Sequence, residues 1–265
     1  MKAHYSPDNL PATLAPIRIR YGQEVGIEEE WKEIIKEDDE IIFKAKINSL
    51  VQRLENNSSE NAFFGTKEKI DTGGFGRGFV LDDMELYYDF FSLVKETKQF
   101  AESESKNIPD GKILNLCIKS AINIYAGSGN PSREKRLQLT TPSYDEDGNE
   151  STPSIKFQKK QKTFLCTEKA AIAHNLWLLL GKKSYFCFTK CDNFDGAGLE
   201  YKDDAHNFTI VEYDGTFKLY DIALDNFCLL DNDCIDNLLS GKGLEVTKVK
   251  NPGCYCPNFT KERNI

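Results

Sequence analysis

The segment HNFTIVEYDGTFKLYDIA, residues 206–223, constrains the fold most, because it predicts both a β-hairpin and its register. Apolar and polar residues alternate on both sides of Asp214-Gly215. An Asp-Gly pair in that setting is the strongest short-range signal for a two-residue type I′ turn. A turn there pairs four sets of positions across the hairpin: 213 with 216, 211 with 218, 208 with 221, and 206 with 223.

This register predicts that a histidine and a carboxylate meet on one face of the sheet. Side chains alternate along a strand, so His206 shares a face with Phe208, and Asp221 opposite Phe208 lies on that face too. The α-carbons of His206 and Asp221 are then diagonal neighbours, roughly 7–8 Å apart. A carboxylate that fixes the tautomer of an imidazole is the orienter–base pair of a nucleophilic triad.

A nucleophile for this pair is predicted at the start of an apolar helix. Residues 164–183, FLCTEKAAIAHNLWLLLGKK, form a helix that Gly181 can end as a C-cap. Cys166 opens that helix, where the helix dipole and the backbone N–H groups stabilise a thiolate. The same N–H groups can hold an oxyanion. His174, two turns further along, is predicted to pack or hydrogen-bond in the core.

The basic run KFQKKQK at 156–162 precedes this helix and supplies two amide side chains. Gln161 is the candidate for a side chain that completes the oxyanion site, with Gln158 as a second choice. The same run also has the composition of a solvated basic face.

The order of these features resembles the core of the transglutaminase-like group within the papain-like cysteine fold. In that group a catalytic Cys starts a buried helix ending near Leu-Gly, and a strand, a His-initiated strand and an Asp-terminated strand follow. The matching segments here are Cys166, LLLGKK at 178–183, SYFCF at 184–188, His206 and Asp221. One departure is Leu165, which stands where the group often has glycine before the cysteine.

The resemblance implies an α+β fold in which a central helix packs on an antiparallel sheet. It implies a catalytic triad of Cys166, His206 and Asp221, without a cofactor or metal. The substrate is expected to be a protein or peptide that carries a carboxamide. Peptide cleavage, glutamine deamidation and transglutamination all stay open, and bacterial effector enzymes that modify host glutamines offer an analogy.

Three alternatives stand beside this hypothesis. The chain could be a non-catalytic binding module in which the triad is a relic. Arylamine N-acetyltransferases share the triad order, and Cys166-Thr167-Glu168 resembles their Cys-x-Glu, but here 165 residues precede the cysteine and only 44 follow Asp221. The clustered cysteines, Cys187 with Cys191 and Cys254 with Cys256, could hold structural zinc, although neither pair has the usual CxxC spacing.

The pattern along the chain predicts three regions. Residues 1–126 form a mainly helical N-terminal region, with helices expected within 27–55, 81–104 and 112–126. Residues 127–155 are rich in turn formers and charges, which is typical of a flexible loop. The catalytic core then occupies 156–265.

The net charge and the hydropathy pattern limit which partners and which cellular location we expect. Acidic residues outnumber basic ones by 42 to 34, and the net charge of -8 argues against nucleic acid or anionic membranes as partners. The N-terminus lacks the apolar core of a signal peptide, and the longest apolar run is LWLLL at 176–180. We therefore expect a cytoplasmic protein, or one exported without a cleaved signal peptide.

Overall fold

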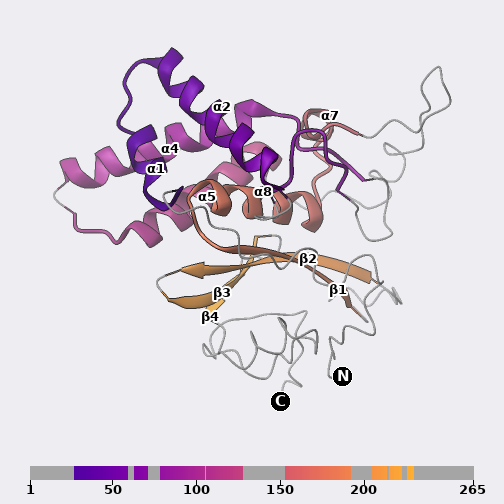
Figure 1. Ribbon diagram of the computed structural model, residues 1–265. Helices are drawn as coiled ribbons and strands as arrows, with labels where there is room; N and C mark the ends of the chain where they lie inside the picture. The colour runs from indigo at the N-terminus through magenta and orange to yellow at the C-terminus, as the bar shows by residue number, and fades with distance from the viewer. Residues whose placement is uncertain are drawn as a thin grey trace, which may run out of the picture.

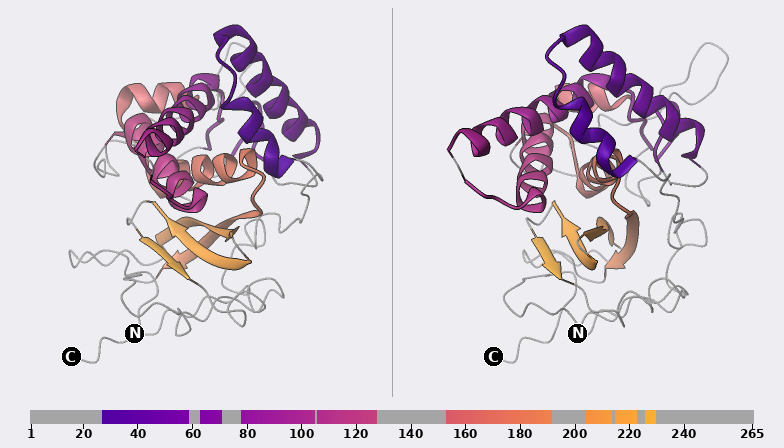
Figure 2. Two further views of the ribbon diagram at one scale, coloured as in Figure 1. Left: turned by 90° about the vertical axis from the view of Figure 1, so that its left-hand side faces the viewer. Right: turned by 60° about the vertical axis from the view of Figure 1, so that its left-hand side comes forward.

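The computed structural model describes these stretches of the chain: 27–58, 63–70, 78–104, 106–127, 153–191, 204–213, 215–222 and 226–229. They form a mixed fold of helices and antiparallel strands, as the sequence predicts, with the helices on one side of the sheet (Figures 1 and 2). The helices are α1 (Ile27–Ile34), α2 (Glu40–Asn56), α4 (Met84–Ser103), α5 (Asp110–Ala126), α7 (Ile155–Gln161) and α8 (Cys166–Leu179). The strands are β1 (Ser184–Cys191), β2 (Asp204–Tyr213), β3 (Thr216–Asp221) and β4 (Asn226–Leu229), paired in that order.

The predicted helices of the N-terminal region are confirmed, and side-chain caps set the starts of two of them, α2 and α4. Asp39 accepts hydrogen bonds from the backbone N–H groups of Ile41 (2.9 Å) and Ile42 (3.0 Å), so α2 begins as a helix separate from α1. Asp83 caps α4 in the same way. The predicted loop at 127–155 lies outside the described residues except at its two ends, and so does the chain after residue 229.

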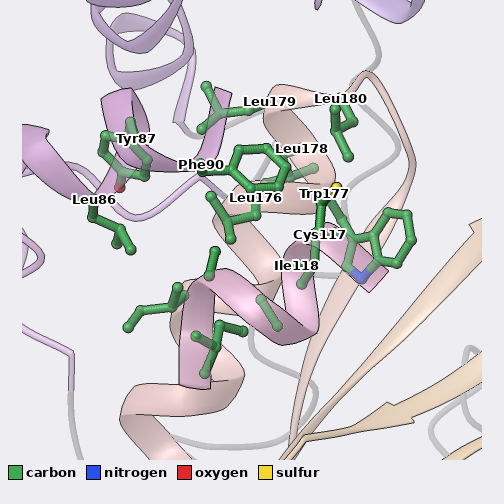
Figure 3. Packing of buried hydrophobic residues seen from close by; sticks show 14 of the residues in the cluster. Leu86, Tyr87, Phe90, Cys117, Ile118, Leu176, Trp177, Leu178, Leu179 and Leu180 are labelled. Atoms are coloured by element: carbon green, nitrogen blue, oxygen red, sulfur yellow. The ribbon is translucent and has the colours of Figure 1, made fainter. Parts of the chain in front are cut away.

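Helix α8 is buried on every side. All of its residues from 167 to 179 are buried. In Figure 1 the helix lies between the other helices and the sheet, and Figure 3 shows its last turns packed against side chains of α4 and α5, including Phe90 and Ile118. A helix without a polar face is stable only where other elements cover it completely.

The end of α8 is set by Gly181, as the sequence predicts. Gly181 has a φ of 70°, which places it in the left-handed region that glycine adopts without strain. The N–H of Lys182 donates to the carbonyl of Trp177 (3.0 Å), and the N–H of Gly181 donates to that of Leu178 (2.9 Å). This is the Schellman pattern, which satisfies carbonyls at the helix end and turns the chain toward β1.

One buried amide ties α8 to the N-terminal region. The Asn175 side chain accepts a hydrogen bond from the N–H of Phe64 (3.0 Å) and donates to the carbonyl of Phe64 (2.9 Å). It also donates to the hydroxyl of Tyr87 in α4 (2.9 Å). The amide thus pairs with the backbone of one distant segment and the side chain of another, and it fixes both against α8.

The predicted hairpin register is confirmed for its inner pairs, and the predicted pairs 208 with 221 and 206 with 223 lie beyond the described ladder. Tyr213 pairs with Thr216 and Val211 with Lys218, and the ladder continues to Thr209 opposite Tyr220. Gly215 has a φ of 67°, as a turn with left-handed residues requires. No helix among the described residues has the length and apolar character to cross a membrane.

We predict that Asn175→Ala lowers the free energy of unfolding by about 3 kcal/mol, because it leaves buried backbone groups of Phe64 without partners. Urea denaturation measures this change. Asn48→Ala is the matched control: Asn48 is exposed and accepts a hydrogen bond from Tyr88, so its loss should cost less than about 0.5 kcal/mol. Equal effects of the two substitutions would contradict the anchoring role of Asn175.

Burial gives the second prediction, on the pH dependence of stability. Burial raises the pKa of the Tyr87 hydroxyl above its ordinary value of 10.0. The unfolded chain ionises this group near pH 10 while the folded protein keeps it neutral, so stability present below pH 10 is lost as the pH rises further. The stability advantage of wild type over Tyr87→Phe should therefore shrink by about 1.4 kcal/mol between about pH 9 and pH 11. A constant difference in stability between wild type and Tyr87→Phe over that pH range would disprove this prediction.

Candidate functional site

Cys166 is the first residue of α8, as the sequence predicts. Its thiol is reduced and half-buried. The residue before it, Leu165, is the N-cap, and the carboxylate of Glu168 accepts a hydrogen bond from the Leu165 N–H (2.9 Å). Glu168 is fully buried, and its hydrogen bond with Leu165 holds the turn that carries the thiol. The sequence comparison with Cys-x-Glu motifs pointed to Glu168 but did not predict this capping role.

Helix α8 and strand β2 run in the same direction, so their starts lie together. Near the two starts, the Asn207 amide Nδ2 donates a hydrogen bond to the Thr167 hydroxyl (2.7 Å). Further on, the Thr209 hydroxyl donates to the carbonyl of Ala170 (3.0 Å). Near the far ends, the rings of Trp177 and Tyr213 lie 6.2 Å apart, measured between centroids.

The contact between Thr167 and Asn207 bears directly on the predicted triad. Cys166 is the residue before Thr167, and His206 is the residue before Asn207. The structure therefore joins the immediate neighbours of the predicted nucleophile and the predicted base by one short hydrogen bond. Because the linked residues are adjacent in sequence, the backbones at 166 and 206 lie near each other.

His206 and Asp221 both lie in the sheet, in the strands where the sequence predicts them. His206 pairs with Thr189 of β1, and Asp221, the last residue of β3, pairs with Asn226 of β4. The side chains of His206 and Asp221 are outside the described part of the structure. Their predicted contact with each other and with the thiol of Cys166 stays a prediction.

The two glutamines before Cys166 differ sharply in environment. Both lie on α7, a short helix that the sequence did not predict because four lysines within KFQKKQK obscure its buried positions. Gln158 has 0% of its surface exposed, and neither atom of its amide has a hydrogen-bond partner among the described residues. Gln161, at the end of α7, is only half-buried. The chain folds back after α7, and the N–H of Thr163 donates to the carbonyl of Gln158 (3.2 Å).

His174 has the structural role that the sequence predicts. It is fully buried, and its Nδ1 lies 2.9 Å from the hydroxyl of Ser184 at the start of β1. Its ring also contacts that of Phe64, at 5.4 Å between centroids. Eight residues of helix, about 12 Å of axial rise, separate His174 from Cys166. His174 is thus an unsuitable partner for the thiol.

The other cysteines give no second nucleophile among the described side chains. Cys117 is buried within α5, and this burial raises the pKa of its thiol. The described part of the chain contains no group of three His, Cys, Asp or Glu residues that could hold a metal ion. The Cys187 and Cys191 side chains and residues 254–256 lie outside it, so the zinc alternative is untested.

No family model matches the chain, and no curated protein and no solved structure matches it significantly.

The capping role of Glu168 leads to a third prediction. Glu168→Ala should lower the free energy of unfolding by about 2 kcal/mol, since it removes a charged acceptor from a partly buried N–H. Glu168→Gln keeps an acceptor oxygen in the same place and should lose less than about half as much. Thermal or urea unfolding of the two variants checks the difference. Equal losses would show that the hydrogen bond to Leu165 is not what stabilises this turn.

Proposed function

We propose that this chain is a cysteine-dependent enzyme that hydrolyses or transfers the acyl group of a carboxamide, with Cys166 as its nucleophile. His206 is the proposed acid and base, and Asp221 orients its ring. The substrate is a protein or peptide. The observation that carries this proposal is the hydrogen bond from Asn207 to Thr167, because it brings the starts of α8 and β2 together.

The proposed fold class is that of the transglutaminase-like group within the papain-like cysteine enzymes. Three features support it: a buried helix that begins with cysteine, an antiparallel sheet that packs along this helix, and a hairpin with His and Asp in neighbouring strands. The helices before α7 would then be an addition to the core.

The geometry sets a requirement for the triad. Asn207 and Thr209 reach α8 with their side chains, so strict alternation assigns positions 206 and 208 to the opposite face. His206 is the third residue of β2, an interior strand of the sheet, and its backbone pairs with Thr189 of β1. The register puts position 221 on that opposite face as well, because Tyr220 pairs with Thr209. The proposal therefore requires the side chains of both His206 and Asp221 to depart from strict alternation in order to meet Cys166.

In the proposed reaction the Cys166 thiolate attacks the carbonyl carbon of the carboxamide. The C–N bond breaks as the imidazolium of His206 gives its proton to the departing ammonia or amine, and a thioester remains on Cys166. Water, or an amine, then attacks the thioester carbonyl while His206 takes up its proton. The thiolate leaves, and the acid or the new amide is released.

The negative oxygen of the intermediate needs donors, and two sources are available. Backbone N–H groups in the first turn of α8 point toward the thiol end of the helix. Gln158 is a stronger candidate for the side-chain donor than Gln161, since its fully buried amide has no hydrogen-bond partner among the described residues. Buried amides without partners are rare in folded proteins, so the amide of Gln158 calls for an explanation, which the proposed role supplies.

Alkylation by iodoacetamide near neutral pH, followed by peptide mapping, tests the proposal. We expect Cys166 to react at least about tenfold faster than any other cysteine, because a thiolate reacts and a thiol does not. Cys117 is the internal control, since burial and a raised pKa keep it unreactive. His206→Ala should slow the reaction at Cys166 by about tenfold or more, and Cys166→Ala should abolish the fast phase.

The same experiment can also refute the proposal. If Cys166 reacts no faster than an ordinary exposed thiol, and His206→Ala changes nothing, the enzyme proposal fails. The binding module with a relic triad is then the better account.

A further inference from the structure

We infer that Asn207 and Thr167 are positioning residues, whose hydrogen bond sets the distance between the thiol of Cys166 and the ring of His206. This inference rests on the proposed function. Neither residue is expected to touch the substrate. Each one holds in place the backbone of the reactive residue that precedes it.

The bond has the properties of a rigid connection. It is short, at 2.7 Å, and its two residues are almost completely buried, with 1% of Asn207 and 2% of Thr167 exposed. Water therefore cannot replace either partner without a local rearrangement. Two interior side chains on different elements are joined, and only one peptide unit separates each from the proposed reactive residue.

Asn207 differs from an amide whose role is structural alone. Asn175 uses both ends of its amide, with partners for its oxygen and its nitrogen. Asn207 uses only its nitrogen, and its carbonyl oxygen is buried without a hydrogen-bond partner among the described residues. An unsatisfied buried oxygen costs stability. The position that Asn207 maintains would account for this cost, since local rules are often broken at functional sites.

Small displacements matter at this position. A nucleophile and its base work at hydrogen-bond distance, and a displacement of about 1 Å can lower a rate by about a hundredfold. The proposed contact requires the ring of His206 to depart from the alternation of β2, so its location depends on how closely this part of β2 is held to α8. The hydrogen bond between Asn207 and Thr167 provides this attachment.

The test is the pH dependence of iodoacetamide alkylation at Cys166, measured from about pH 4 to pH 10. In wild type, the thiolate–imidazolium pair should keep the rate high well below the ordinary thiol pKa of about 8.5. Thr167→Val removes the hydroxyl and keeps the shape, and Asn207→Ala removes the amide. Each should move the midpoint upward by about one pH unit and lower the rate near pH 6 by about tenfold.

Two variants separate positioning from a general loss of packing. Thr209→Val removes a hydrogen bond on the same face of β2, from an equally buried hydroxyl to α8, and should leave the pH profile unchanged. Thr167→Ser keeps the hydroxyl and should restore the wild-type profile. Circular dichroism establishes that each variant is folded, and if Asn207→Ala is not, the near-isosteric Thr167→Val decides.

The outcomes distinguish this inference from the proposal on which it rests. If wild type has no reactive thiolate at low pH, the proposed function fails and takes the inference with it. If wild type has one, but Thr167→Val and Asn207→Ala behave like Thr209→Val, the proposed function stands and the positioning role is overturned.

Discussion

The complete burial of helix α8 is the constraint on which the rest of the structure depends. This helix has no face that water could solvate, so helices must cover one side and a sheet the other. Several polar side chains on it have partners from other elements. Thr167 has one in β2, His174 in β1, and Asn175 in the segment at 63–65 and in α4.

These polar contacts also determine which ends of the elements meet. Apolar packing alone would allow α8 to slide along the sheet, because dispersion contacts are individually weak and not directional. Hydrogen bonds at Thr167 and Ala170 exclude such a shift, since each requires one particular residue of β2. The same contacts bring the backbones at 166 and 206 near each other, which is the placement that the proposed chemistry needs.

The sequence predicts those features of the fold that depend on a few neighbouring residues. The Asp-Gly turn predicts the register of β2 and β3 next to the turn, and Gly181 predicts the end of α8. Each of these depends on a few neighbouring residues whose backbone preferences are strong. The position of Cys166 at the start of its helix followed for the same reason.

Features that depend on contacts between residues far apart in the sequence, or on the surroundings of a segment, could not be predicted from local sequence. The pairing of Asn175 with Phe64 joins residues 111 positions apart, and nothing in either local sequence indicates it. Helix α7 was missed because its buried positions, Ile155 and Gln158, are hidden among lysines. The bond between Thr167 and Asn207 could have been suspected only from knowing that helix and strand run in the same direction.

The central claim, that Cys166 and His206 form a coupled pair, is tested most directly by NMR titration of the histidine rings. The chain has only three histidines, so assignment is tractable. The account predicts that the pKa of His206 lies above the ordinary value of about 6.5 and falls by about one unit or more in Cys166→Ala, because the thiolate stabilises the imidazolium. An identical pKa of His206 in wild type and variant would contradict it.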